Sequence, residues 1–308
     1  MANIDREKHP LDLQEVEPSP VEETPSQSKD GYFPDSSNAP KGTHHLGLHS
    51  QHSSIWWLSR IQKYSSYAFS AFAAAHITNT SLIPLLTRSV PASEPYLLLT
   101  RPYYQGLPFE PLLVVIPLYA HILSGLALRV ARRNLAAKRY GEGTSSPEGW
   151  KTFFTSKFWP SVSGISKLGF AMTPLVVGHV VINRAVPQGF AGGSSNVNLG
   201  YVSHAFAKHP AVSFAGFAAL LGVGCWHITW GWAKWLGWTP DQTTAMGGER
   251  EVIKKRRWYI INGLAAALTT LWMAGGIGVV GRGGEAPGWV GRGYDEMYRS
   301  IPVIGRWM

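Results

Sequence analysis

Four histidines stand out because each lies inside a long apolar stretch of the chain. They are His76, His121, His179 and His227, one in each of the first four such stretches. An ionisable side chain at membrane depth is costly and normally faces the interior of a helix bundle. Paired imidazoles from facing helices are typical ligands of a b-type haem iron. The pattern therefore predicts one or two haem b groups, with these four histidines as the iron ligands.

Other residues around the histidines fit the same hypothesis. A porphyrin needs small residues where it approaches a helix, and Gly125, Gly224 and Gly231 lie one turn from His121 or His227. Gly178 adjoins His179. Propionates need a cation, and Arg129, two turns beyond His121, is the candidate. The alternatives are that the histidines bond Ser, Thr or backbone groups, or that an ancestral haem site has lost its cofactor.

The elements that must position these histidines are five apolar stretches of about 20 residues, enough to cross ~30 Å of hydrocarbon as helices. They cover about 64–86, 111–131, 164–186, 211–235 and 258–280. We expect an all-α membrane protein with a disordered tail (residues 1–55), a five-span bundle (56–281) and a short C-terminal tail (282–308). Adjacent Asp295 and Glu296 are expected to be solvated in that last tail.

The charge of the links predicts the orientation. The links after the second and fourth stretches carry eleven basic residues, whereas the other two links carry three, namely Arg88, Arg101 and Lys208. With an odd number of spans, the N-terminal tail lies on the same side as the two basic links. We therefore expect a cytosolic N-terminus and a C-terminus on the opposite side.

Depth then predicts how the histidines pair. At 1.5 Å per residue, His76 and His179 lie roughly 18–22 Å from the cytosolic edge, while His121 and His227 lie at roughly 15 Å and 6–8 Å. The first two match well, and helix tilt can close the gap between the second two. The order of spans, with His121 followed by Gly125 and Arg129, resembles the membrane-anchor cytochromes of succinate dehydrogenases and fumarate reductases.

The N-terminal 55 residues hold nine acidic and four basic residues and few apolar ones, a composition typical of disorder. Within them, Leu13 and Val16 precede Pro18 and Pro20. Proline pre-orders an extended segment, which lowers the entropy cost of docking, and the two apolar side chains can fill pockets. The pattern predicts a linear peptide ligand.

Three C-terminal segments carry a second resemblance: 254–259 (KKRRWY), 272–276 (WMAGG) and 288–295 (GWVGRGYD). They are similar to a fungal mitochondrial outer-membrane family, that of the Mdm-ten-complementing protein. The resemblance implies a five-span adaptor whose Pro-x-Pro motif recruits a vacuolar-protein-sorting, bridge-like lipid-transfer protein. It would thereby promote vacuole–mitochondrion contacts and lipid homeostasis. The motif maps onto Leu13, Val16, Pro18 and Pro20.

Several function classes have no support in the sequence. There is no Gly-rich phosphate loop, no nucleophile elbow and no pair of carboxylates within a span, so we expect no enzyme and no catalytic residue. The single cysteine, Cys225, excludes an intrachain disulfide. We expect membrane lipids as partners and no nucleic acid. A lipid scramblase or an acceptor of delivered lipid is a further alternative that fits the family's lipid role.

Overall fold

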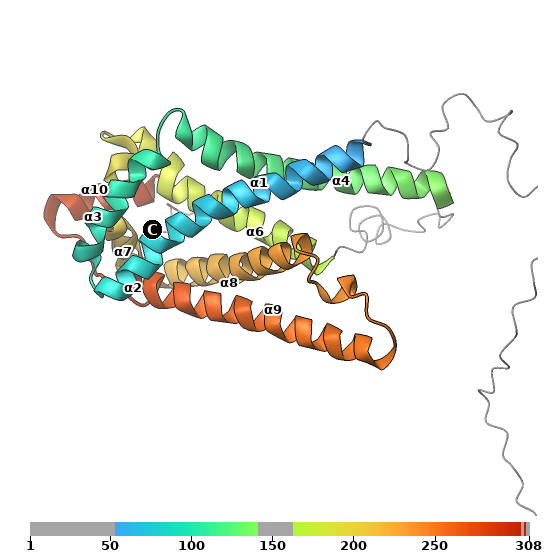
Figure 1. The fold of residues 1–308 in the computed structure, drawn as a ribbon. Coiled ribbons are helices and arrows are strands. Elements are labelled where there is room, and N and C mark those ends of the chain that lie inside the picture. The colour runs from blue at the N-terminus through green and yellow to red at the C-terminus, as the bar shows by residue number, and fades with distance from the viewer. Residues whose placement is uncertain (1–52, 141–162, 303–304, 306–308) are drawn as a thin grey trace, which may run out of the picture. The chain divides into compact units, whose positions relative to one another are not determined.

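The computed structural model describes residues 53–140, 163–302 and 305, and no strand occurs among them. Five helical segments are long and apolar enough to cross a membrane: Ser54–Thr87, Pro111–Arg132, Gly164–Gly189, Pro210–Gln242 and Gly247–Arg282. The predicted all-α class with five spans is confirmed (Figure 1). The tail of residues 1–52 lies outside the described residues.

The spans are built from α-helices that continue into short π-helical or 3₁₀ segments. The first two contain α1 (Ser54–Ile77), η1 (Thr78–Leu82), α2 (Ile83–Thr87), η3 (Pro111–Val115) and α4 (Ile116–Tyr140). The other three contain α6 (Gly164–Val180), η5 (Val181–Ala185), η6 (Pro187–Gly189), α8 (Pro210–Trp235), η8 (Pro240–Gln242), α9 (Gly247–Gly276) and η9 (Val280–Arg282). Shorter elements lie between and after the spans: α3 (Val90–Thr100), η2 (Arg101–Tyr103), η7 (Gly193–Asn196), α7 (Leu199–Lys208) and α10 (Gly288–Arg299).

Two spans begin well before the apolar stretches that predict them. The first helix starts at Ser54 rather than residue 64, because the Ser53 side chain accepts a hydrogen bond from the Trp56 N–H and caps it there. The last starts at Gly247 rather than residue 258 and continues through the basic run at 254–257. Lys and Arg are good helix formers, so the helices extend past their apolar parts.

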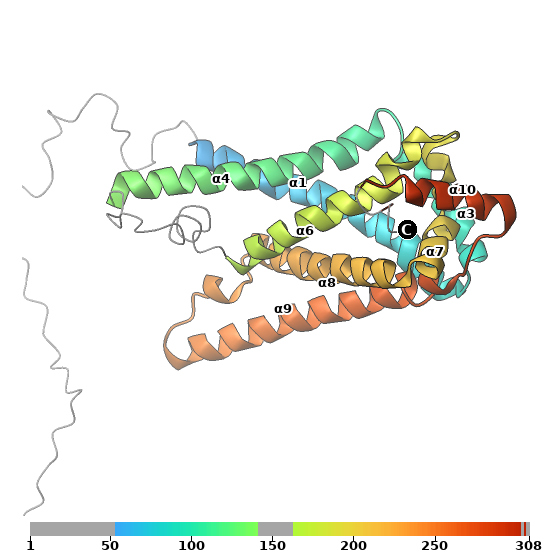
Figure 2. The ribbon, with the colours of Figure 1, turned by 180° about the vertical axis from the view of Figure 1, so that it is seen from behind.

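The helices pack in two close pairs with a fifth helix on one side. α1 lies along α4, and α6 lies along α8, while α9 packs against α8 (Figures 1 and 2). α1 and α6 begin at the same end of the bundle, where α4 and α8 end and α9 begins. The start of α1, the basic C-terminal part of α4 and the basic start of α9 therefore lie at one end, called here the basic end.

The π-helical segment η1 ties the first span to the last. Ser81 Oγ donates to Trp272 O at 2.6 Å and accepts from the Gly276 N–H at 3.1 Å. A Cβ on Gly275 would lie 1.9 Å from Ser81 O, so only glycine permits this approach. The glycines of the 272–276 segment thus have a packing role.

The end away from the basic links is closed by a cap of α3, α7, η9 and α10. In the described part of the chain, the two clusters of buried hydrophobic residues both lie here. One contains Tyr201, Tyr294, Met297, Tyr298 and Ile301, and the other contains Leu97, Leu199 and Val280. The Tyr201 and Tyr298 rings stack at 4.5 Å, and Tyr298 Oη donates to Tyr201 O at 2.8 Å.

The expectation of a plain C-terminal tail over residues 282–308 is wrong for its first part. α10 packs its tyrosines against α7, and Asp295 is not simply solvated. Its Oδ1 lies 2.9 Å from Nε2 of His204, whose side chain is 1% exposed. Glu296 is exposed, as expected. The periodicity of Tyr294, Met297 and Tyr298 on one face of a short helix explains the burial.

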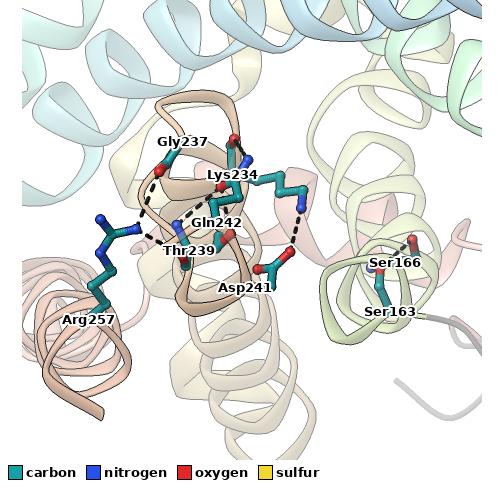
Figure 3. Close-up of polar contacts among 8 residues, drawn as sticks. All are labelled: Ser163, Ser166, Lys234, Gly237, Thr239, Asp241, Gln242 and Arg257. Atoms are coloured by element: carbon teal, nitrogen blue, oxygen red, sulfur yellow. Dashed lines mark hydrogen bonds and ion pairs between the residues drawn. The ribbon is translucent and has the colours of Figure 1, made fainter. Parts of the chain in front are cut away.

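The connection from α8 to α9 at the basic end is held by polar contacts (Figure 3). Thr239 and Gln242 form a reciprocal cap at the start of η8. The Arg257 guanidinium donates to Thr239 O at 3.2 Å and lies 5.9 Å from the Trp238 ring centre. Lys234 pairs with Asp241 at 2.8 Å. These contacts fix the path of this basic link.

Candidate functional site: two histidine pairs

The structure brings the four membrane histidines together in two pairs. The ring centroids of His76 and His179 lie 5.9 Å apart, with their planes at 75°. Those of His121 and His227 lie 6.1 Å apart, with their planes at 76°. These are the pairs that the depth argument predicts. Each pair joins one helix of the α1/α4 unit to one helix of the α6/α8 unit.

The two pairs occupy separate levels along the bundle. His121 Nδ1 lies 3.2 Å from Gln62 O on α1, and His227 Nδ1 lies 3.2 Å from Ile165 O on α6. His76 follows Gln62 by 14 residues, and His179 follows Ile165 by 14 residues. At 1.5 Å per residue, the levels are about 21 Å apart. We call His121–His227 the inner pair, nearer the basic end, and His76–His179 the outer pair.

This separation is larger than the depths estimated from the sequence. That estimate took the start of the first apolar stretch as the membrane edge, whereas α1 begins ten residues earlier, at Ser54 rather than residue 64. The contact between His121 and Gln62 also sets the inner pair close to the start of α1. Because α1 and α6 are continuous through both levels, the 14-residue spacing directly measures the distance between the two histidine pairs along the bundle.

Each pair is formed by equivalent residues of two similar helical hairpins. The first hairpin runs α1, α3, α4, and the second runs α6, α7, α8. A π-helical segment begins two residues after His76, at Thr78, and two residues after His179, at Val181. Such π segments are rare and are frequent at functional sites. The repeated layout shows that His76 and His179 hold corresponding positions in the two hairpins.

A glycine that the sequence argument missed supports the inner pair. A Cβ on Gly169 of α6 would lie 3.1 Å from His227 Cε1, so the imidazole rests against the helix backbone. The glycines singled out from the sequence behave differently. Gly125 faces the Gln62 side chain and Gly224 faces Met172, while Gly178 and Gly231 face open space. Only contact across helices could reveal Gly169, since it is distant from His227 in sequence.

Arg129, the predicted propionate partner, lies two helical turns beyond His121 on α4 and contacts Phe170. Its guanidinium carbon is 5.3 Å from the centre of the Phe170 ring, next to Gly169 on α6. Arg129 therefore reaches from α4 across to α6, on the basic-end side of His121. A cation held against an aromatic ring keeps its N–H donors at the ring's periphery for an anion.

The outer pair has aromatic and amide neighbours. Phe72 stacks on His76 at 5.6 Å, and Phe217 meets His179 edge-on at 6.1 Å. Asn183 Nδ2 lies 3.3 Å from His179 Nδ1 and donates to His179 O at 2.9 Å. His76 Nδ1 is buried and has no hydrogen-bond partner within the described residues. A buried ring nitrogen without a partner needs an explanation.

The donor set and spacing fit haem iron. The facing imidazoles of each pair, with ring centroids 5.9 and 6.1 Å apart, are the residues that would hold a haem iron. No group of three or more His, Cys, Asp or Glu side chains that could hold a metal ion occurs within the described ranges. Two protein ligands suit an ion that brings its own equatorial ligands, as haem iron does. The backbone contact that gives His227 room at Gly169 agrees with this assignment.

The other predicted binding residues, Leu13, Val16, Pro18 and Pro20, lie outside the described residues. The peptide-ligand hypothesis therefore stays a prediction from the sequence. The same holds for the disorder expected for that tail.

Comparison with known proteins bears on the family. A family model described as MDM10-complementing protein 1, transmembrane domain, matches residues 174–285. This match, over about a third of the chain, supports the family predicted from the C-terminal segments. No curated protein and no solved structure gave a match. The chain is thus a multi-span membrane protein of the MDM10-complementing type, and such a protein fits a mitochondrial membrane.

The MDM10-complementing match covers one member of each histidine pair. It begins inside α6, ends just after η9, and includes His179, His227 and Gly275. It also contains the segments 254–259 and 272–276 from which the family is predicted, but not 288–295. The resemblance to succinate dehydrogenase and fumarate reductase anchors remains a prediction.

Proposed function

We propose that this protein is a mitochondrial outer-membrane adaptor that recruits a bridge-like lipid-transfer protein to the organelle surface. The recruiting element is the tail peptide of Leu13, Val16, Pro18 and Pro20, and the five-span bundle is the anchor. The role supports vacuole–mitochondrion contacts and mitochondrial lipid homeostasis. It involves no catalysis, and membrane lipids surround the bundle.

The observation that carries the proposal is the gathering of the basic end of α4, the basic start of α9 and the start of α1 at one end of the bundle. Positively charged links favour the cytosolic side of a membrane. A tail that enters the bundle at this end is then cytosolic, where a lipid-transfer protein can reach it. As a flexible coil of about 55 residues, it extends roughly 40 Å.

The test is the double variant Pro18→Ala with Pro20→Ala in the full chain. We expect the lipid-transfer protein to leave mitochondria while the variant stays inserted in the outer membrane at the wild-type level. Substitution of Pro25 and Pro34, which lie in the same tail outside the motif, is the matched control and should leave recruitment intact. Unchanged recruitment by the double variant would reject the motif.

A second candidate function rests on the two histidine pairs. We propose that the bundle is a b-type cytochrome with one haem at each level, used for electron transfer or for sensing redox state or haem. When bound, haem supplies one-electron redox chemistry. His76, His121, His179 and His227 would hold the iron, and Arg129 would neutralise a propionate at the inner level. An anchor alone has no need of this arrangement, whereas a cytochrome that also recruits a partner does.

Absorbance spectroscopy of the purified protein separates the two functions. A cytochrome gives sharp reduced bands, and these are lost one level at a time when histidines are replaced. Recruitment through the tail should survive those replacements, because the peptide and the bundle act independently. Loss of recruitment in every histidine variant would contradict that independence.

A further inference from the structure

Three buried polar atoms without partners lie at the cap end of the bundle. They are Arg101 Nε, Arg184 Nη1 and Glu94 Oε1. Buried donors and acceptors are nearly always satisfied, and an unpartnered one costs about 1–3 kcal/mol. Arg101 follows α3, Glu94 lies within it, and Arg184 lies in η5, so three separate points of the chain converge.

The two arginines are differently paired. Arg184 Nε donates to Glu110 Oε1 at 2.7 Å, and its Nη2 pairs with Glu110 Oε2. This leaves Nη1 unused. Arg101 has only a long contact from Nη1 to Ser195 O, at 3.5 Å. Among the described residues Arg101 has no carboxylate within 4 Å, so its charge lacks a direct counter-ion.

Glu94 is close enough to interact with Arg101 but does not pair with it. Glu94 Oε2 accepts from the Leu199 N–H at 3.0 Å, while Oε1 stays unbonded. Burial raises the pKa of Glu94, while the Leu199 N–H and the charge of Arg101 oppose that change. Burial also lowers the pKa of Arg101; Tyr104 and Glu94 oppose that change, and the like charge of Arg184 adds to it. Two neighbouring cations in partial burial favour an added anion.

Both arginines are connected to the outer histidine pair through neighbouring residues. Arg184 follows His179 by five residues, about one turn of the π segment that contains it. Arg101 precedes Tyr104, whose ring meets Phe72 at 5.5 Å, and Phe72 stacks on His76. The unused Arg101 Nε and Arg184 Nη1 are buried, although the Arg184 side chain as a whole is 26% exposed. A ligand held inside the bundle at the outer pair would satisfy both groups, and a lipid headgroup is the rival that the test below distinguishes.

We propose that Arg101 and Arg184 form an anion site for the propionate carboxylates of a haem held by His76 and His179. The proposal rests on the haem-binding candidate above. In this proposal Arg101 and Arg184 neutralise propionate charge at the outer level, as Arg129 would at the inner level. Planar guanidinium groups suit carboxylates because they present several N–H donors in a fixed fork.

The test is a redox titration of the purified full-length protein, with Arg101→Gln as the main variant. A cation near the iron disfavours the oxidised form, so its removal should lower the midpoint potential of the outer haem. A tenfold change in the one-electron equilibrium corresponds to about 59 mV, and we expect a change of about that size. Arg101→Lys keeps the charge and should restore most of the potential.

A second variant guards against a folding defect. Arg184→Gln alone leaves Glu110 without its partner, so it is combined with Glu110→Gln to keep the pair neutral. The exposed Arg88, at the same end of the bundle, provides the control Arg88→Gln, which should leave both potentials unchanged. Arg129→Gln should move the inner haem alone.

The outcomes distinguish this proposal from the cytochrome candidate. Wild-type protein without haem overturns both. The wild-type protein can instead bind haem at His76 and His179 while Arg101→Gln and the Arg184/Glu110 double variant leave the potentials unchanged. That result overturns only the anion site, and the unpartnered N–H groups are then assigned to water. Loss of co-purified phospholipid from those variants, again with unchanged potentials, reassigns the site to a lipid headgroup and also overturns the proposal.

Discussion

The imidazoles of His76 and His179 face each other at 5.9 Å from helices that belong to different closely packed pairs. The residue two positions after each begins a π-helical turn. His121 and His227 also face each other, at 6.1 Å, nearer the basic end but within continuous α-helices. The bundle is thus organised around two like sites about 21 Å apart along its helices.

The contact between Gly169 and His227 gives a test of the inner site. Gly169→Val places methyl groups where the imidazole rests, since even a Cβ would lie 3.1 Å from its Cε1. We expect the protein to lose its inner haem and keep the outer one, so that haem content falls by about half. Gly164→Val, at the start of the same helix with nothing within 4 Å, should retain both. Equal haem loss in the two variants would contradict a specific contact.

The approach of Ser81 to Gly275 predicts a large loss of stability from a small substitution. Gly275→Ala forces α9 away from η1, because the new Cβ would lie 1.9 Å from a backbone oxygen. Overpacking of this kind costs about 1–3 kcal/mol, visible as a lower Tm in detergent. Gly263→Ala, in the same helix with open space at its Cβ, should be neutral or slightly stabilising. A similar Tm for both variants would refute the packing role.

The His204–Asp295 pair predicts a particular pH dependence of the cap. Ala286 N–H donates to His204 Nδ1 at 3.1 Å, so Nε2 carries the proton and donates to Asp295. This hydrogen bond lowers the pKa of Asp295, while desolvation opposes the shift. The resulting stability is complete above the ordinary carboxyl pKa, about 4, and is lost as pH falls through the lowered value.

Asp295→Asn should therefore lower the free energy of unfolding at pH 7 by about 1 kcal/mol, which is seen as a lower Tm. It should also reduce the further loss of stability between pH 5 and pH 3. Thermal unfolding in detergent across that range measures both effects. Glu296→Gln changes an adjacent exposed acid and serves as the control. If stability falls equally steeply between pH 5 and pH 3 in Asp295→Asn and in the wild type, Asp295 is not the group that causes the fall.

The sequence predicts the spans and the histidine pairing because both depend on local properties. Apolar length alone indicates a membrane-crossing helix, and the order of spans decides which histidines share a level. The helix starts at Ser54 and Gly247 were missed because capping and the helix propensity of Lys and Arg extend helices beyond their apolar parts.

Contacts between distant segments were not predictable in the same way. Gly169 rests under a histidine 58 positions further along the chain, and His204 meets Asp295 across 91 positions. The cap was not predicted because α10 is short and carries several charged residues. Its overall composition is therefore polar, although one of its faces carries buried tyrosines. The sequence places Arg101 only among the link charges, since its convergence with Arg184 depends on the fold of α3 and η5.

The measurement that tests the cytochrome account most directly is the visible spectrum of the purified protein, oxidised and then reduced with dithionite, together with its haem content. The account predicts sharp reduced bands of bis-histidine haem and about two haems per chain. His121→Ala or His227→Ala should remove one, and His76→Ala or His179→Ala the other. A featureless spectrum from protein made in haem-supplied cells would contradict it and leave the histidines with a structural role.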